Sequence, residues 1–279
     1  MPAVIAAGLL AAPACASEVD TEHLFGFSEG ADIGKKGEGE LEAETIVRQG
    51  KAAGQYGALS EALEVKYVFT DRLRLGGRAT FSYHGISGVP GLPDRGSGGM
   101  QGVSFEARYV LVERARAPFG LTLIATPRWG RIDDVSGEAV RSYGGVLTLV
   151  ADRELVAGHW YGAVNLLYDA GATHVHDTGL WQHDSKAGIA AAIAGRAHGD
   201  LFLGAEVRYF RAYDGLGFDR YAGEALFAGP TMYVQLSPTW TMSGAWNWQI
   251  YGQTAAGGGS LNLTQFERQQ VKFRVNYHF

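Results

Sequence analysis

From about residue 39 onward, apolar and polar side chains alternate along the chain. In residues 103–111, Val, Phe, Ala, Tyr and Leu occupy every second position, with Ser, Glu and Arg among the residues between them. Successive side chains of a strand point to opposite faces, so each such segment has one apolar and one polar face. Residues 73–83, 201–209 and 271–279 repeat the pattern, and no comparable helical period is present. The sequence therefore predicts an all-β protein.

Twelve segments alternate in this way, and the connections between them differ regularly in length. The predicted strands are 39–48, 57–69, 73–84, 102–112, 119–130, 143–151, 160–169, 181–194, 201–210, 223–236, 240–251 and 264–279. Compact turns alternate with longer, mostly Gly-rich loops such as 85–101 and 252–263. Short turns at one end and long loops at the other are typical of outer-membrane barrels. We predict a single closed antiparallel transmembrane β-barrel of about 12 strands over residues 39–279, with short periplasmic turns and long extracellular loops.

Aromatic residues cluster at the two ends of the apolar faces. Near the short turns lie Tyr67, Phe69, Phe119, Trp160, Trp240, Tyr277 and Phe279, and near the loops lie Tyr83, Trp129, Tyr168, Trp181, Tyr209 and Trp248. Two aromatic belts separated by aliphatic residues match a bilayer with two interfaces. A soluble β-sandwich also alternates, but it gives no reason for this segregation of rings.

Composition and charge exclude several other classes of protein. Gly reaches 40 of 279 residues, and the net charge of −5 gives no electrostatic support to a nucleic-acid partner. A mean hydropathy of −0.06 excludes a helical membrane bundle, whose spans each need about 20 apolar residues.

The first 38 residues precede the predicted barrel and divide into two parts. Residues 1–16 form a short uncharged apolar run that ends in Ala14-Cys15-Ala16, the small-residue pattern of a signal-peptidase site. We predict a signal peptide cleaved near Ala16, which removes the only cysteine. Residues 17–38 are Gly-rich and charged, and we expect either a periplasmic segment or a plug inside the lumen.

The chain ends in a motif that marks a known class of proteins. Apolar residues stand at every second position of the last strand, namely Val271, Phe273, Val275, Tyr277 and the terminal Phe279. This end resembles the C-terminal assembly signal of Gram-negative outer-membrane β-barrel (porin-like) proteins. The resemblance implies an outer-membrane location, insertion by the barrel-assembly machinery, and contact with membrane lipid and lipopolysaccharide. The size is similar to that of twelve-stranded barrels, which include solute channels, lipid hydrolases and autotransporter translocators, and no motif selects among them.

The polar faces of the strands predict which charges line the lumen. The predicted acids are Glu40, Glu42, Glu44, Glu64, Glu106, Asp184 and Glu206, and the predicted bases are Arg48, Lys66, Arg74, Arg78, Arg108, Arg128, Lys186, Arg208, Lys272 and Arg274. Ten bases against seven acids leave an excess of three positive charges. Fixed charge in a pore favours one sign of ion, so the balance predicts a weak preference for anions. The alternative is that these groups pair across strands and fill a closed lumen.

Two histidine-containing stretches suggest chemistry that we weigh against transport. His183 and Ser185 share a strand face, the spacing found in the outer-membrane phospholipase, but Lys186 follows where that family has Asn. His174 and His176 precede that strand, and a hairpin centred on Thr178-Gly179 would pair His174 with His183 and could form a metal site. Isolated histidines in loops are more often solvated, and we expect neither a metal nor a cofactor.

The leading hypothesis is a non-enzymatic outer-membrane channel for passive diffusion of small hydrophilic solutes. The first alternative is a closed structural or adhesion barrel without transport. The second is an outer-membrane lipid hydrolase that uses His183 and Ser185.

Overall fold

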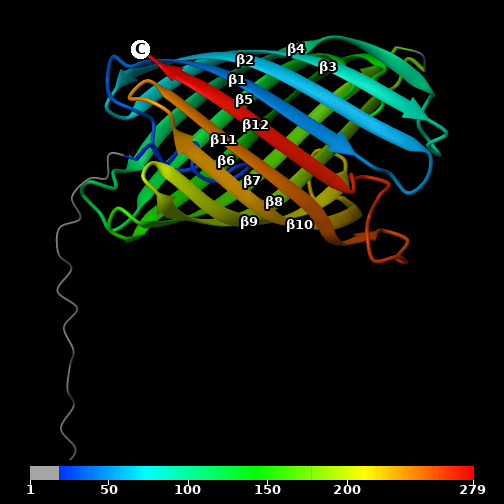
Figure 1. Cartoon of the computed structure of the whole chain (residues 1–279). Coiled ribbons are helices and arrows are strands. Elements are labelled where there is room, and N and C mark those ends of the chain that lie inside the picture. The colour runs from blue at the N-terminus through cyan, green and yellow to red at the C-terminus, as the bar shows by residue number, and fades with distance from the viewer. Residues whose placement is uncertain (1–18, 177) are drawn as a thin grey trace, which may run out of the picture.

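The computed structural model describes residues 19–176 and 178–279 as one closed barrel (Figure 1). Its strands are β1 (Gly39–Gln49), β2 (Gln55–Thr70), β3 (Leu73–Ser87), β4 (Arg95–Val112), β5 (Gly120–Ile132), β6 (Ala139–Val156), β7 (Trp160–Val175), β8 (Trp181–His198), β9 (Leu201–Asp214), β10 (Arg220–Gln235), β11 (Trp240–Thr254) and β12 (Gln269–His278). Each strand pairs antiparallel with its neighbours in sequence, and β1 pairs with β12 to close the sheet. The predicted fold class is confirmed, whereas the predicted signal peptide lies outside the described residues.

The distribution of polarity is that of a membrane barrel. Large apolar side chains on the outer face are exposed, as for Leu63 and Phe105, which are 62% and 64% exposed. Charged side chains face inward and are buried, as for Arg74, Arg108 and Arg274. Within the described residues, no helix has the length and apolar character needed to cross a bilayer. A closed sheet leaves no unpaired strand edge in lipid, which explains why β1 pairs with β12.

The hairpins extend further toward the extracellular end than the alternation predicts. The predicted loop 85–101 shrinks to residues 88–94, because β3 and β4 continue to pair through partners such as Gly85 with Gly96. Glycine has no side chain to alternate, so a Gly-rich strand pairs through its backbone without a sequence signal. Strand also replaces part of the predicted loop 170–180, because β7 continues to Val175.

The last connection differs in the opposite direction. The predicted final strand begins at residue 264, but β12 begins at Gln269, and residues 255–268 form a long connection that folds back against the barrel. Phe266 is buried in a cluster with Phe210 and Phe227. Lys51 Nζ donates to the Phe266 carbonyl at 3.1 Å and lies 3.5 Å from Glu267 Oε1. These contacts hold the segment inside the extracellular end.

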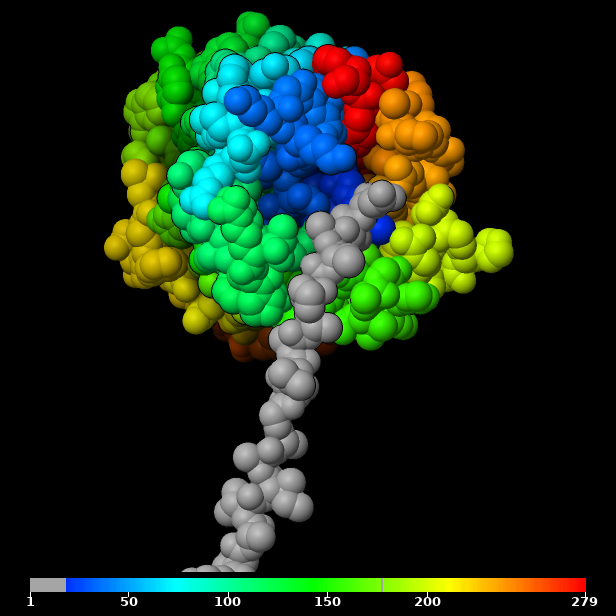
Figure 2. Space-filling view, turned by 90° about the vertical axis from the view of Figure 1, so that its left-hand side faces the viewer, coloured from blue at the N-terminus to red at the C-terminus, as the bar shows by residue number. Residues whose placement is uncertain are grey.

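The N-terminal segment, residues 19–38, enters the barrel at the end where the chain terminates (Figure 2). Leu24 and Phe25 are fully buried in a cluster with Tyr161, Phe202 and Tyr233 of the barrel wall. Gly26 is required at the closest approach, because its φ is +77° and a Cβ would lie 2.7 Å from Ala245 Cβ. The buried part of this segment therefore lies inside the barrel at that end, whereas residues 34–37 are exposed.

Phe279 contributes to the closure of the barrel between β1 and β12. The Phe279 and Gly39 backbones exchange two N–H···O hydrogen bonds of 2.9 Å, and the Phe279 ring stacks on Tyr277 at a centroid distance of 6.0 Å. We expect deletion of Phe279 to lower the yield of folded barrel several-fold, because it removes this closure and part of the predicted assembly signal. The fraction with heat-modifiable gel mobility in outer membranes measures the effect. Phe69→Ala, which removes an exposed ring elsewhere, is the control, and an unchanged yield after Phe279 deletion would contradict the assignment.

Candidate functional site

The strand pattern concentrates charges on one side of the lumen wall. The contributing strands β4, β3, β2, β1 and β12 are consecutive neighbours around the barrel. Their side chains in this cluster are Glu40, Glu42, Glu44, Glu64, Lys66, Arg74, Arg78, Glu106, Arg108, Lys272 and Arg274. The alternation turns each of them inward, and we call this set the charged wall.

Glu22 of the N-terminal segment lies at the centre of the charged wall. Its carboxylate accepts hydrogen bonds from the Arg74 guanidinium, lies 2.6 Å from Arg108 Nη1, and accepts a hydrogen bond of 3.2 Å from Lys66 Nζ. Burial raises the pKa of Glu22, but the charges of Arg108 and Arg74 outweigh burial and hold this pKa well below its usual range. Glu22 is therefore an ionised carboxylate that bridges three wall cations.

Two further side chains of the segment contact the same wall. Glu29 Oε1 accepts a hydrogen bond from Arg274 Nη2 at 3.1 Å, and Glu29 Oε2 lies 3.6 Å from Arg108 Nη2. His23 is fully buried, with Nε2 2.9 Å from Glu40 Oε1 and Nδ1 in contact with the Arg274 guanidinium. The segment thus docks through a polar network as well as through Leu24 and Phe25.

Other wall charges pair with each other. Arg78 forms ion pairs of 2.8 Å with Glu42, 2.7 Å with Glu44 and 2.7 Å with Glu64. Arg74 Nη2 also donates to Glu106 at 3.0 Å. Counting the wall with Glu22 and Glu29 gives seven carboxylates against six Lys and Arg side chains. The positive excess expected from the strands alone is absent from this cluster while the segment is docked.

Glu206 and Arg208 of β9 contact the N-terminal segment outside the charged wall. Glu206 accepts hydrogen bonds from the backbone N–H groups of Phe27 and Ser28 at 3.1 and 2.8 Å. Arg208 lies 3.8 Å above the Phe27 ring and donates to Asn247 at 3.0 Å. These contacts place both predicted pore-lining residues against the N-terminal segment.

Arg128, another predicted pore-lining residue, is separate from the charged wall. It forms an ion pair of 2.7 Å with Asp169 of β7, which also lies 3.7 Å from Lys186. This smaller network belongs to the other half of the barrel.

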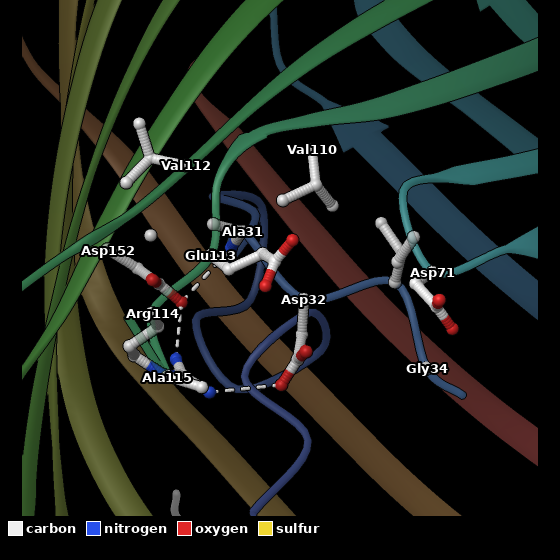
Figure 3. Close-up of a pocket in the computed structure, with 12 residues that line it drawn as sticks. Ala31, Asp32, Gly34, Asp71, Val110, Val112, Glu113, Arg114, Ala115 and Asp152 are labelled. Carbon is white, nitrogen blue, oxygen red and sulfur yellow. Dashed lines mark hydrogen bonds and ion pairs between the residues drawn. The ribbon is translucent and has the colours of Figure 1, made fainter. Parts of the chain in front are cut away.

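Arg114 holds the N-terminal segment at the periplasmic end of the barrel, beside a small pocket (Figure 3). Arg114, in the turn between β4 and β5, donates to Asp32 at 3.0 Å, to Asp152 at 2.8 Å and to the Thr21 hydroxyl at 2.9 Å. The turn thereby joins both ends of the docked segment to β6. Sequence reasoning missed Arg114, because a charged residue in a short turn carries no period that marks it as inward.

Two connections between strands contact the barrel wall at the extracellular end. In residues 133–138, Asp134 forms a salt bridge with Arg48, and the Val135 carbonyl accepts a hydrogen bond from the Tyr56 hydroxyl at 3.1 Å. Residues 255–268 cover the neighbouring side through Phe266 and Glu267. Arg48 was predicted to face the lumen, and its partner lies in a loop that the sequence did not place.

Two groups of side chains have the geometry to offer three metal ligands. Among the described residues these are Glu22, His23 and Glu29, and His23, Glu40 and Glu42. Lys66 and Arg274 already contact these carboxylates and supply the positive charge that a metal ion would bring.

The predicted grouping of three histidines is wrong in register. His174 pairs with Trp181 and Ala172 with His183, because the hairpin closes at Val175, whose carbonyl accepts the Gly179 N–H at 2.9 Å. The three imidazoles do not form a metal-ligand group in the part of the chain that the structure describes.

The His183–Ser185 pair lacks the arrangement of a nucleophile and its base. The Ser185 side chain is buried, and its hydroxyl donates to the Gly217 carbonyl at 2.6 Å. This hydrogen bond commits the proton that His183 would have to accept.

The closed barrel, its apolar outer face and its polar lumen define a twelve-stranded barrel of the outer membrane of Gram-negative bacteria. Residues 17–279 match the family of unknown function DUF6662, and the chain belongs to that family. A search of curated proteins finds no match.

Solved structures share this fold at low sequence identity. The COG4313 outer membrane channel from Pseudomonas putida F1 aligns with a TM-score of 0.60 and 14% identity over 89% of this chain and 98% of that one. The beta domain of the Bordetella autotransporter Brka gives 0.54 and 14% over 88% and 100%, and the NanC porin gives 0.50 and 9% over 86% and 98%. The predicted resemblance to porin-like outer-membrane barrels is confirmed at the level of the fold.

Proposed function

We propose that this protein is an outer-membrane channel for small hydrophilic solutes, and that its N-terminal segment closes the lumen in the conformation described here. The observation that carries the proposal is the pairing of Arg108. Within residues 19–176 and 178–279, both ion pairs of this fully buried arginine are made with the segment, through Glu22 and Glu29. If the segment leaves the lumen, the charged side chains that it now covers would line a polar passage.

The fold supports the same function without deciding it. One protein of similar fold is described as an outer membrane channel, and another as a porin. Transport of solutes by this chain, and a weak preference for anions once the segment has left, remain part of the proposal.

The closed structural barrel stays as the second candidate, because Arg78 pairs with three glutamates of the wall itself. Conductance of the purified protein in planar bilayers separates the two, when measured with and without the N-terminal segment. A barrel that conducts in neither form is not a channel. We propose no enzymatic activity, since Ser185 is engaged by Gly217.

We expect the segment to dock more tightly as the pH falls from about 7 to about 5. Burial raises the pKa of Asp32 from 3.8 to about 6, although the Arg114 guanidinium acts in the opposite direction. The docked state therefore holds a proton that the released segment loses, so this contribution to docking is full below 3.8 and is lost as the pH rises through about 6. Burial also raises the pKa of Asp20, which acts in the same direction.

The measurement is the open probability in planar bilayers at the two pH values, with the lower value expected in acid. Asp32→Asn mimics the protonated carboxyl and should weaken the dependence. If Asp32→Asn responds to pH as the parent protein does, Asp32 does not contribute to it.

A further inference from the structure

An outward-facing patch at the extracellular end of β5, β6, β7 and β8 plays no part in the proposed channel. Trp129 and Tyr143 are paired across β5 and β6, and Tyr143 stacks on Trp181 of β8 at a centroid distance of 6.4 Å. His174 of β7 lies 5.2 Å from the Trp181 ring. Three of these rings are in contact, and Trp129 lies beside them in the strand register.

Two arginines flank the rings. The Arg131 guanidinium lies 5.9 Å from the Trp129 ring, and Arg141 is paired with His174 across β6 and β7. Both arginines are exposed, and neither forms an ion pair with any residue in 19–176 or 178–279. Arg128, three positions before Arg131, is paired with Asp169 inside the barrel. The outer patch thus presents two positive charges that no described residue pairs with.

The position of the patch sets the chemistry that it meets. Tyr143 and Trp181 are half exposed at the loop end of the apolar outer face, where aromatic side chains mark the boundary between hydrocarbon and head groups. At this boundary the outer leaflet presents phosphorylated glycolipid. Guanidinium groups donate paired hydrogen bonds to phosphate, and aromatic faces pack against acyl chains and sugars.

We propose that Arg131 and Arg141, with the ring surface between them, bind the phosphate groups of lipopolysaccharide through its lipid A. The proposal rests on the location and orientation of the barrel and not on transport. Loss of conductance in any variant would therefore leave it unaffected.

The test is an equilibrium titration of the purified full-length barrel in detergent micelles, read by native mass spectrometry. The probes are bisphosphorylated lipid A and the same lipid A after removal of its phosphates. The variants are Arg131→Gln/Arg141→Gln and, as a matched control, Arg153→Gln. Arg153 is also exposed on β6 but lies near its periplasmic end. Heat-modifiable gel mobility verifies that each variant is folded.

We expect the double variant to raise the Kd for bisphosphorylated lipid A about tenfold, and Arg153→Gln to leave it unchanged. Removal of the phosphates from the probe should weaken binding to the parent barrel by a similar factor. This second comparison needs no variant, so it tests the proposal even if the double variant fails to fold. Equal binding of both probes, or an equal effect of Arg153→Gln, would overturn the assignment.

Discussion

Deletion of residues 19–36 is expected to convert a closed barrel into a conducting one. The segment fills the periplasmic lumen through the buried Leu24 and Phe25 and through Glu22 in the charged wall. Without it, the wall exposes a polar surface to water. In planar bilayers we expect the full-length protein to show rare openings and the deletion variant to show sustained steps of several-fold larger mean conductance.

The deletion should also change the charge of the passage. It removes Glu22 and Glu29 and leaves six Lys and Arg side chains of the charged wall against five carboxylates. The reversal potential under a KCl gradient should therefore show a weak preference for anions that fades at high salt, where screening shortens to a few ångströms.

A synthetic peptide of residues 19–36 is the control for this experiment. Added from the periplasmic side, it should reduce the conductance of the deletion variant, whereas a peptide of the same composition in scrambled order should not. A deletion variant that folds, as judged by heat-modifiable mobility, and remains silent would exclude a channel closed by this segment. It would favour the structural barrel.

The alternation of side chains was sufficient to predict most of the barrel. A period of two fixes which face a residue occupies, so Arg74, Arg108 and Arg274 could be assigned to the lumen from the sequence. The same signal fails where side chains stop alternating. Paired glycines such as Gly85 and Gly96 extend a hairpin without a pattern.

The charge partners inside the lumen could not be predicted for a different reason. Glu22 and Arg108 are 86 positions apart, and Glu22 lies in a segment with neither a strand nor a helical period. Counting charges on strands alone therefore left out Glu22 and Glu29, the two segment carboxylates that pair with cations of the charged wall. Arg48 and Asp134 show the same limit, because a loop supplies the partner of a strand residue.

The second large effect is expected from Glu22→Gln. The substitution keeps the size of the side chain but removes the negative charge shared by Arg74, Arg108 and Lys66, all of which are buried. Removing one partner of a buried ionic network costs about 3 kcal/mol or more, which corresponds to a shift of roughly a hundredfold in the equilibrium between docked and released segment.

The barrel itself should survive this substitution, because its strand pairing does not involve the Glu22 side chain. Limited proteolysis from the N-terminus measures release of the segment, and heat-modifiable mobility reports the barrel. Glu38→Gln is the matched control: Glu38 lies in the same segment but pairs with His278 at 3.0 Å, away from the charged wall, and should change protection little. Glu22→Asp keeps the charge and should retain part of the protection. If Glu22→Gln stays as protected as the parent protein, apolar packing of Leu24 and Phe25 holds the segment, and the charged wall is not what closes the lumen.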